Sequence, residues 1–299
     1  MPDGIIICKH SNHYDVETAD GLILSCTARK KCGTLVCGDS IKWEPLEEST
    51  GVITALNDRK NLLSRPDRRG ALKAIASNID QLFVVVSKQP NEKLPDIDRY
   101  LLASELLSID AVIVLNKIDL LTSAELEKFD EQLSHYAPIG YQTIHTSVKE
   151  SNGLDNLRQQ LIDKSSIFIG QSGVGKSSIV QALFPDESIR IGKLSTATGL
   201  GKHTTSVSRL YHLPESGSII DSPGIREFTL WEMSPDQVAS GFREFLPYHG
   251  LCQFNDCLHH TEPGCAIREA LNDGKIDTQR YQHYIEILEE MKISSIPKY

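Results

Sequence analysis

Two short stretches, and the order in which they occur, constrain the fold of this chain more than any other feature. Residues 116–119 read NKID, and residues 170–177 read GQSGVGKS. The second stretch has the complete pattern G-x-x-x-x-G-K-[ST] of a phosphate-binding loop. The first has the pattern N-K-x-D, which is typical of guanine recognition. In ordinary guanine-nucleotide-binding proteins the phosphate loop comes first, so the parts of such a site occur here in rotated order.

Apolar runs around both stretches predict an α/β fold. Residues 82–86 and 111–115 are continuous apolar runs, which are typical of parallel strands buried on both faces. Residues 166–169 form a further strand that leads into the phosphate loop, and residues 177–183 form the helix after it. Ligands of open α/β sheets bind at the carboxyl ends of the strands. Because both motifs follow strands, we expect them to form one site.

The phosphate loop has the residues that binding of a nucleoside triphosphate requires. Its glycines let backbone N–H groups turn toward the phosphates, Lys176 reaches the β and γ phosphates, and the Ser177 hydroxyl binds magnesium. An accidental glycine-rich turn is the alternative, but the pattern is complete and lies between a strand and a helix. The residues predicted to contact the nucleotide here are Gly170, Gln171, Ser172, Gly173, Val174, Gly175, Lys176, Ser177 and Ser178.

Asp119 predicts which base is bound. Guanine offers two adjacent donors, N1–H and the exocyclic amine, and an ionised carboxylate accepts both, whereas adenine has a bare acceptor at N1. An ATP-dependent enzyme would need Asp119 to face adenine, which this count of donors disfavours. Asn116 supplies an amide for the other edge of the base and for tying neighbouring loops, the stem of Lys117 covers the ring, and Ile118 completes the stretch. Ser147 is expected to present its backbone N–H to the guanine oxygen, with an ordinary loop as the alternative.

A further part of the nucleotide site follows a predicted strand at residues 218–220. Asp221 holds magnesium through water, and Gly224 brings its N–H to the γ-phosphate with little steric cost. In many GTPases the residue after this glycine is a glutamine that orients the attacking water. Here it is Ile225, which cannot hydrogen-bond water. We therefore expect slow hydrolysis by the protein alone, or a different residue that places the water.

The polar segment at residues 199–205 contains the candidate for that task. Thr205 is expected to complete the magnesium shell together with Ser177, and Thr204 is the second choice. His203 is the candidate catalytic residue, because an imidazole titrates near neutrality and can orient or activate the water. A surface histidine without a role is the alternative.

The two ends of the chain predict two further domains. Short β-like runs separated by turn residues, at 4–8, 21–26, 34–36, 40–43 and 51–56, predict a small closed barrel of the oligonucleotide-binding (OB) type, and the basic residues 62–70 predict a linker after it. Beyond residue 231, helical patterns over 234–248 and 280–291 flank a segment rich in cysteine and histidine. The predicted architecture is therefore multidomain: an N-terminal all-β OB-fold barrel over 1–63, a central α/β circularly permuted P-loop GTPase domain over 64–231, and a small α-rich zinc-binding domain over 232–299.

The cysteine and histidine spacing predicts one structural zinc site. Three thiolates and one imidazole form a closed tetrahedral set that suits zinc, and they come from Cys252, Cys257, His259 and Cys265. His260 is the alternative to His259, and buried cysteines without a metal are the alternative to the whole set. The other cysteines are expected to be small apolar residues of the barrel, with a second zinc site as the alternative: Cys8, Cys26, Cys32 and Cys37.

Composition limits where the chain can act. The 299 residues are 40% hydrophobic and 24% charged, which is typical of a soluble globular protein. No uncharged apolar run is long enough to span a membrane, and the first residues do not read as a signal sequence, so we expect a cytoplasmic protein without a membrane partner. The net charge of −9 weighs against wrapping of nucleic acid, but it leaves room for a local basic face.

Together with their order, these motifs resemble the RsgA (YjeQ) family of circularly permuted GTPases, which act in late assembly of the small ribosomal subunit. The resemblance covers nearly the whole chain and includes the four predicted metal ligands, Trp43 and the stretches 38–39, 63–66, 78–80, 98–100, 116–119, 170–178, 199–205 and 221–227. It implies hydrolysis stimulated by the 30S subunit, release after hydrolysis, and His203 in place of the missing glutamine. The chain lacks the long basic N-terminal extension of some members, so rRNA contacts through such an extension are not expected.

The resemblance also implies the cofactors and partners. We expect one structural Zn²⁺ and Mg²⁺ bound with GTP, in a monomer whose partners are GTP and GDP, the 30S subunit with its 16S rRNA, and other assembly factors. A GTP-regulated binding protein with a partner other than the ribosome is the alternative, which the acidic net charge favours. A barrel and a zinc domain are both common RNA-binding surfaces and favour the ribosomal function.

The rotated order also predicts how a switch reaches the zinc domain. Because Asp221–Gly224 is the last nucleotide-binding element, the residues after it lead directly into the zinc domain. We expect the γ-phosphate to reposition that domain through this short connection.

Overall fold

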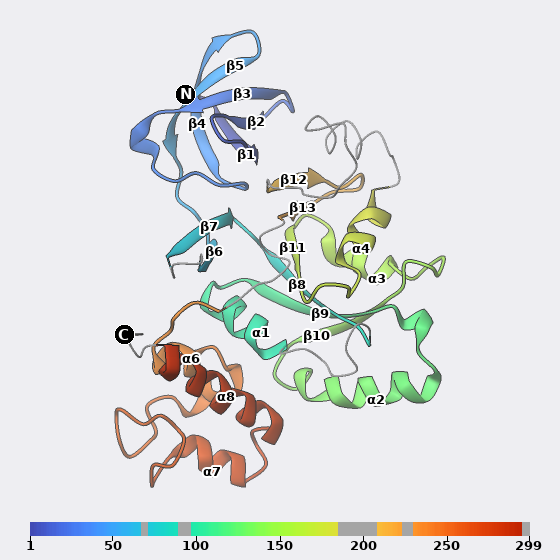
Figure 1. Ribbon diagram of the computed structural model, residues 1–299, viewed down its shortest axis with the longest axis vertical. Helices are drawn as coiled ribbons and strands as arrows, with labels where there is room; N and C mark the ends of the chain where they lie inside the picture. The colour runs from blue at the N-terminus through green and yellow to red at the C-terminus, as the bar shows by residue number, and fades with distance from the viewer. Residues whose placement is uncertain (67–70, 89–96, 185–207, 223–229, 295–299) are drawn as a thin grey trace.

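Three structural parts follow one another along the long axis of the molecule (Figure 1): a β-barrel, an α/β layer and a group of helices. The computed structural model describes residues 1–66, 71–88, 97–184, 208–222 and 230–294. The order of the parts is the one predicted from the sequence, with an N-terminal barrel, a central α/β unit and a C-terminal α-rich unit. None of the helices in these ranges is both long enough and apolar enough to cross a membrane. The domain borders 1–63, 64–231 and 232–299 stay predictions.

Five N-terminal strands close into the predicted barrel. They follow the order β1-β2-β3-β5-β4, and β4 also pairs with β1 to close the ring. The interior is apolar, because Ile6, Val16, Ile41 and Ile53 are fully buried there. The elements are β1 Asp3–Lys9, β2 Tyr14–Thr18, β3 Ile23–Ala28, the 3-10 helix η1 Lys30–Cys32, β4 Ser40–Glu47 and β5 Thr50–Leu56.

The barrel differs from the sequence prediction at two segments. The apolar run at residues 34–36 predicts a strand, but the N–H of Val36 donates to the Asp39 carboxylate at 2.8 Å, so the run is a buried turn. The strand that the sequence pattern does not predict is β2, Tyr14–Thr18, in which polar residues flank the buried Val16. A single apolar side chain at its centre gives a weak sequence signal, and pairing with β1 and β3 determines the structure instead.

The segment after the barrel forms a small sheet rather than the linker predicted over residues 62–70. Its strands β6, Leu62–Pro66, and β7, Leu72–Ser77, pair in antiparallel fashion. Leu63 and Ile75 are buried in the core of the α/β layer. These apolar side chains outweigh the basic composition that indicated a linker.

The central sheet has parallel strands and one antiparallel strand beside the barrel. The strand order is β10-β9-β8-β11-β13-β12, with β12 antiparallel to β13. At this edge the sheet continues into the barrel, because Cys8 of β1 pairs with Arg209 of β12. The strands are β8 Gln81–Val86, β9 Asp110–Asn116, β10 Gln142–Thr146, β11 Ser165–Ile169, β12 Arg209–His212 and β13 Ser218–Asp221.

Helices cover both faces of this sheet (Figure 1), as its continuous apolar strands predict. Val84 of β8 joins one core with Leu101 of α1, and the next residue, Val85, joins a second core with Ile179 of α4. The elements are α1 Ile97–Leu106, the 3-10 helix η2 Ile118–Leu120, α2 Ser123–Leu133, the 3-10 helix η3 Ser134–Tyr136, α3 Asp155–Leu161 and α4 Lys176–Leu183.

The C-terminal helices pack against α1. The predicted helix over 234–248 is divided into α6 and the 3-10 helix η5, because the chain turns at Gly241, where a Cβ would lie 1.9 Å from Leu102 of α1. Leu102 belongs to the core of the C-terminal part. The elements are α6 Pro235–Ser240, η5 Arg243–Tyr248, α7 Ala266–Asn272 and α8 Thr278–Ser294.

A buried ionic network reinforces this packing. The Arg280 guanidinium of α8 donates to Glu244 of η5 at 2.7 Å and to Asp98 of α1, and all three side chains are at least 96% buried. The Tyr136 hydroxyl donates to Asp98 at 2.7 Å. Removing one partner of such a network leaves a buried charge unpaired, which typically costs about 3–5 kcal/mol. The helical part is therefore tightly joined to α1.

Candidate functional site

The carboxyl ends of the parallel strands bring the predicted nucleotide-binding residues to one edge of the sheet. β9 ends at Asn116, β10 at Thr146, β11 at Ile169 and β13 at Asp221. Asn116 and Thr146 are register partners on adjacent strands, and β11 lies between β8 and β13. The N-K-x-D stretch, the residues after Thr146 and the phosphate loop thus start from the same edge, as expected for one site.

The phosphate loop connects β11 to α4, which begins at Lys176. Gly170 has a φ of 138°, and a Cβ there would lie 2.2 Å from the carbonyl oxygen of Val85, so a larger residue does not fit. The Lys176 ammonium donates to the carbonyls of Gly170 and Gln171, both at 2.6 Å. Val174 is buried in the core beneath the loop, which anchors it. Two residues of the loop and two in the first turn of α4 are exposed, namely Ser172, Gly173, Ser177 and Ser178.

Two hydrogen bonds tie the N-K-x-D stretch to the phosphate loop. The amide of Asn116 donates to the Val174 carbonyl at 2.9 Å, and the Lys117 ammonium donates to the Gly173 carbonyl at 2.6 Å. The Thr146 hydroxyl donates to the Asn116 side-chain oxygen at 3.0 Å, so both ends of this buried amide are bonded. The structure therefore shows the loop-tying role predicted for Asn116.

Asp119 is held as an ionised carboxylate. The Ser147 hydroxyl donates to one carboxylate oxygen at 2.7 Å, and the Lys149 ammonium lies 3.2 Å from the other. The hydrogen bond from Ser147 is the main cause that lowers the pKa of Asp119; partial burial opposes it, and Lys149 adds to the lowering. A carboxylate in this state accepts from two adjacent donors, as guanine recognition requires.

Ser147 is used differently from the sequence prediction. Its backbone N–H, which was expected to face the guanine oxygen, donates instead to the Gly153 carbonyl at 3.0 Å. A Cβ on Gly153 would lie 2.1 Å from the Ser147 carbonyl oxygen, so the loop closes tightly on itself. The hydroxyl of Ser147 is the group that contacts the predicted base site.

The residues predicted to bind magnesium and to form the switch are described only in part. Asp221 is half-buried at the end of β13, and the hydroxyl of the next residue, Ser222, accepts from Ser208 at 2.7 Å. Ser177 lies in the first turn of α4, the helix that follows β11, and β11 is the strand that pairs with β13. The other predicted residues lie outside the described residues: His203, Thr204, Thr205, Gly224 and Ile225.

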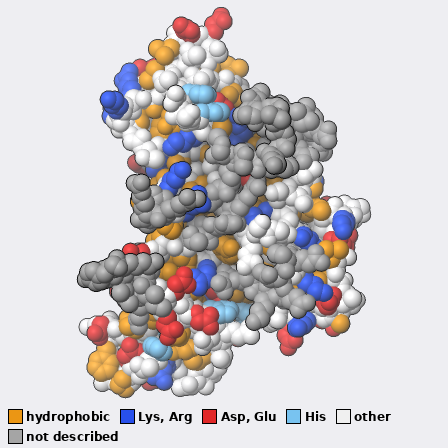
Figure 2. All heavy atoms as spheres, in the orientation of Figure 1, with side chains coloured by type: hydrophobic (Ala, Val, Ile, Leu, Met, Phe, Trp, Pro, Cys, Tyr) orange, Lys and Arg blue, Asp and Glu red, His pale blue; other side chains and the backbone are white. Residues whose placement is uncertain are grey.

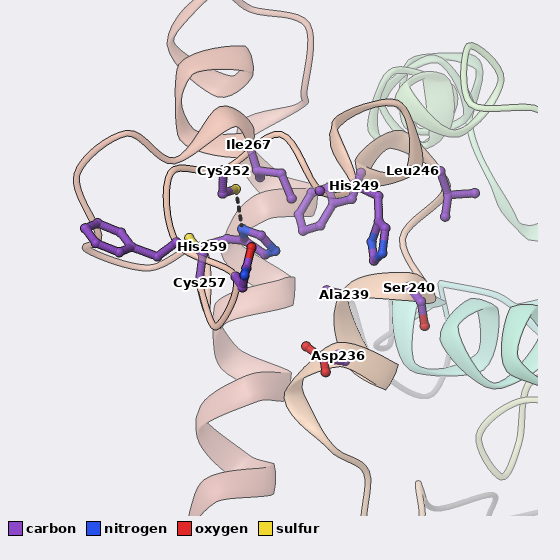
Figure 3. Close-up of a pocket in the computed structure, with 13 residues that line it drawn as sticks. Asp236, Ala239, Ser240, Leu246, His249, Cys252, Cys257, His259 and Ile267 are labelled. Atoms are coloured by element: carbon purple, nitrogen blue, oxygen red, sulfur yellow. Dashed lines mark hydrogen bonds between the residues drawn. The ribbon is translucent and has the colours of Figure 1, made fainter.

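The predicted metal ligands converge in the C-terminal part, and Figure 3 shows three of them, Cys252, Cys257 and His259. One donor atom from each of these three residues and from Cys265 lies within 4.8 Å of all the others. The Nδ1 atom of His259 is 3.5 Å from the Sγ atoms of Cys252 and Cys265, and those two sulfurs are 4.0 Å apart. His260 is not in this cluster. The choice of His259 over His260 is therefore the one that the geometry supports.

The donor set fits a zinc ion. Zinc bonds of 2.0–2.3 Å in a tetrahedron separate ligand atoms by about 3.3–3.8 Å, close to the separations measured here. Burial raises the pKa of the Cys257 thiol to about 12, so a nearby cation is needed for it to become a thiolate at neutral pH. The hydroxyls of Tyr281 and Tyr284 donate to the carbonyls of His259 and Leu258 at 2.7 and 2.8 Å and fix the ligand loop.

Sequence reasoning missed two side chains that support the base site. Lys149 pairs with Asp119, and Thr146 bonds Asn116. Both lie within two residues of Ser147, so a search for donors around that serine would have found them. The four barrel cysteines are buried, as predicted.

Comparisons with known proteins agree over nearly the whole chain. The sequence model of the RsgA GTPase family matches residues 56–231. The small ribosomal subunit biogenesis GTPase RsgA 1 of Vibrio vulnificus (strain YJ016) is 46% identical over 293 residues, covering 96% of this chain and 83% of the relative. The small ribosomal subunit biogenesis GTPase RsgA of Actinobacillus pleuropneumoniae serotype 5b is 46% identical, covering 97% and 85%.

Solved structures give the same result. YjeQ from Thermotoga maritima superposes with a TM-score of 0.80 at 30% identity, covering 97% of this chain and 98% of that protein. YloQ, described as a circularly permuted GTPase, superposes with a TM-score of 0.78 at 27% identity, covering 100% of this chain and 97% of that protein. The rotated motif order and the three-part fold are thus both found in solved proteins.

Proposed function

The chain belongs to the RsgA GTPase family and hydrolyses GTP, and we propose that it does so in the late maturation of the small (30S) ribosomal subunit. On this proposal the protein binds the 16S rRNA of the subunit while GTP is bound, and it leaves after hydrolysis to GDP and phosphate. The names of the Vibrio vulnificus and Actinobacillus pleuropneumoniae relatives support the assignment to the small subunit.

The observation that carries the nucleotide part of this proposal is the arrangement around Asp119. An ionised carboxylate, held by Ser147 and Lys149, lies on a stretch that is bonded to the phosphate loop through Asn116 and Lys117. The distance from base to phosphates is therefore fixed by direct contacts between the two loops. Such a site selects guanine over adenine by donor count and positions its phosphates at the N-terminus of α4.

The proposed function also includes two metal ions, each held by named residues. Magnesium bound with GTP would be held by Ser177 and by Thr205, which lies outside the described residues; it neutralises phosphate charge when bound. A structural zinc would be held by Cys252, Cys257, His259 and Cys265, and the measured separations support that set. His203, also outside the described residues, is proposed to orient the attacking water in place of the glutamine that Ile225 replaces.

A local basic surface supports RNA binding by this acidic protein. Arg29, Lys30 and Lys31 are consecutive and exposed on the barrel, between β3 and β4. Basic side chains also gather at one edge of the barrel in Figure 2. A basic patch on one face is the electrostatic feature that nucleic-acid contact requires, whatever the sign of the net charge.

We further propose that the protein acts as a cytoplasmic monomer, together with other assembly factors.

The experiment that tests this function compares GTP hydrolysis by the full chain alone, with 30S subunits, and with 50S subunits. The proposal predicts at least a tenfold acceleration by 30S subunits and none by 50S subunits. Equal rates in all three reactions would exclude the ribosomal role and leave a GTP-regulated protein with another partner. The His203→Ala variant is expected to lose the acceleration; an unchanged rate would remove His203 from the mechanism.

A further inference from the structure

A second group of potential metal ligands lies at the turn between β1 and β2. The turn contains the spacing C-x-H-x2-H-x-D, formed by Cys8, His10, His13 and Asp15. The Cys8 Sγ, one ring nitrogen of His10 and one carboxylate oxygen of Asp15 lie within 4.8 Å of one another. This group lies where the barrel meets the central sheet, apart from the helical part that contains Cys252 (Figure 1).

The histidine rings already face the carboxylate. The His10 Nε2 atom is buried and 3.1 Å from the Asp15 Oδ2, yet the angle does not allow a hydrogen bond. The rings of His10 and His13 stack with centroids 4.2 Å apart, and the His13 Nε2 atom is 4.0 Å from the Asp15 Oδ1. The backbone N–H of His10 donates to the backbone carbonyl of His13 at 2.9 Å, which fixes the turn. The donor atoms of Cys8, His10 and Asp15 therefore converge, and the ring of His13 lies beside them against His10.

Two donors that can carry negative charge and one neighbouring cation determine the charge of this group. Arg209 of β12 donates to Asp15 Oδ2 at 2.9 Å and also contacts Cys8. The guanidinium bonds the same carboxylate oxygen that faces His10, so it lies beside the ligand group, and its charge opposes binding of a further cation. A Cys8 thiolate and the Asp15 carboxylate would supply two negative charges to a divalent ion, so that Arg209 lowers the affinity without abolishing it.

We propose that Cys8, His10 and Asp15, with His13 as the fourth ligand, bind one structural Zn²⁺. A thiolate, imidazoles and a carboxylate are the donors that zinc uses, and tetrahedral zinc separates them by about 3.3–3.8 Å. The His10 and His13 side chains are 32% and 42% exposed, so the ion enters from solvent and the rings turn onto it without repacking of the core. Cys8 pairs with Arg209 where barrel and sheet join, so the ion would fasten that junction.

The test measures zinc bound per chain by elemental mass spectrometry, after equilibration of the full-length protein with excess Zn²⁺ and desalting. We expect two equivalents in the unchanged protein and one in the double variant His10→Asn, His13→Asn. That variant alters two partly exposed side chains that are not part of the barrel core. Cys8→Ser is also expected to bind one equivalent. The matched control Cys26→Ser, which changes a buried barrel cysteine outside the group, is expected to keep two.

A Cys257→Ser variant distinguishes the two sites. It should retain the ion at the barrel and lose the one in the C-terminal part. A single equivalent in the unchanged protein that Cys257→Ser removes would overturn the proposal, and so would two equivalents retained by the double histidine variant. If Cys8→Ser does not fold, as judged by circular dichroism, the double histidine variant decides the question.

Discussion

At the residue scale, the proposed recognition of guanine depends on the ionisation of Asp119. The hydrogen bond from Ser147 lowers the pKa of this carboxyl against the opposing effect of burial, and Lys149 contributes in the same direction. The carboxylate consequently stays ionised at pH values at which an ordinary aspartate takes up a proton. The pattern N-K-x-D predicts Asp119 itself. Its hydrogen bond with Ser147 is not predicted by the pattern, because it depends on the pairing of β9 with β10.

Replacing Ser147 by alanine should change the pH dependence of GDP binding. Without the hydroxyl, the pKa of Asp119 returns toward its usual value, so protonation and loss of affinity begin at a higher pH. At neutral pH we expect binding weaker by about tenfold, the usual effect of one hydrogen bond to a charged group. Fluorescent-GDP titrations across a pH series measure both effects, with the exposed Ser134→Ala as control. Identical pH profiles for Ser147→Ala and the unchanged protein would contradict this role.

At the element scale, the site depends on loops that contact one another closely above the sheet. Gly175, the last loop residue before α4, has a φ of 101°, and a Cβ there would lie 2.3 Å from the Asn116 amide nitrogen. This glycine lets the phosphate loop approach the N-K-x-D stretch closely enough for Asn116 to bond the Val174 carbonyl. Gly175 thus permits a close contact within the protein, in addition to the contact with phosphate that is predicted for the loop.

The Gly175→Ala variant tests this contact. We expect more than a tenfold loss of GDP affinity, because the methyl group displaces Asn116 and the phosphate loop together. The control Gly21→Ala has a similar backbone angle, with a φ of 80°, but nothing within 4 Å of the added carbon. Both variants carry the backbone penalty of about 1–2 kcal/mol, and a shift of melting temperature measures it. Equal GDP affinities in the two variants would show that the close approach has no part in binding.

Much of the α/β layer and of the site follows from local patterns, whereas the long-range contacts do not. The apolar runs predict β8, β9 and β11. The nucleotide-binding motifs and the cysteine–histidine spacing predict the residues of the two candidate sites, because each motif consists of residues that are close together in the sequence. The ion pair between Arg280 and Asp98 joins residues 182 positions apart. Similarly, β2 depends on its pairing partners, and the ligands around Cys8 form no standard cysteine motif. Tertiary packing determines these features, and no local pattern encodes them.

At the scale of the whole molecule, two of the junctions that the described residues form between the helical part and the α/β layer bear on a nucleotide switch. Leu230 and Trp231, which follow the last predicted nucleotide-binding element, pack against the core of the α/β layer and against that of the helical part. The buried Arg280 and Asp98 form the second junction, on α1. A signal from the γ-phosphate that passes through Trp231 must therefore move α1 with the helical part or strain the ionic network.

Hydrogen exchange tests this connection. We expect the protection of residues 225–233 to differ between the GDP complex and the complex with a non-hydrolysable GTP analogue, because the switch leads directly into them. Protection of α8 near Arg280 should stay the same in both complexes if α1 and the helical part move as one body. Equal protection of residues 225–233 in the two complexes would refute the direct coupling.

The most direct test of the account is the nucleotide preference of Asp119→Asn. Asparagine loses the acceptor for the exocyclic amine of guanine but gains a donor for the 2-oxo group of xanthine. Competition binding should show at least about a hundredfold loss of GDP affinity and a preference for XDP over GDP. The control Asp130→Asn, an exposed aspartate that bonds His145, should keep the preference for GDP. Unchanged GDP affinity in Asp119→Asn would contradict the central claim that this carboxylate selects guanine.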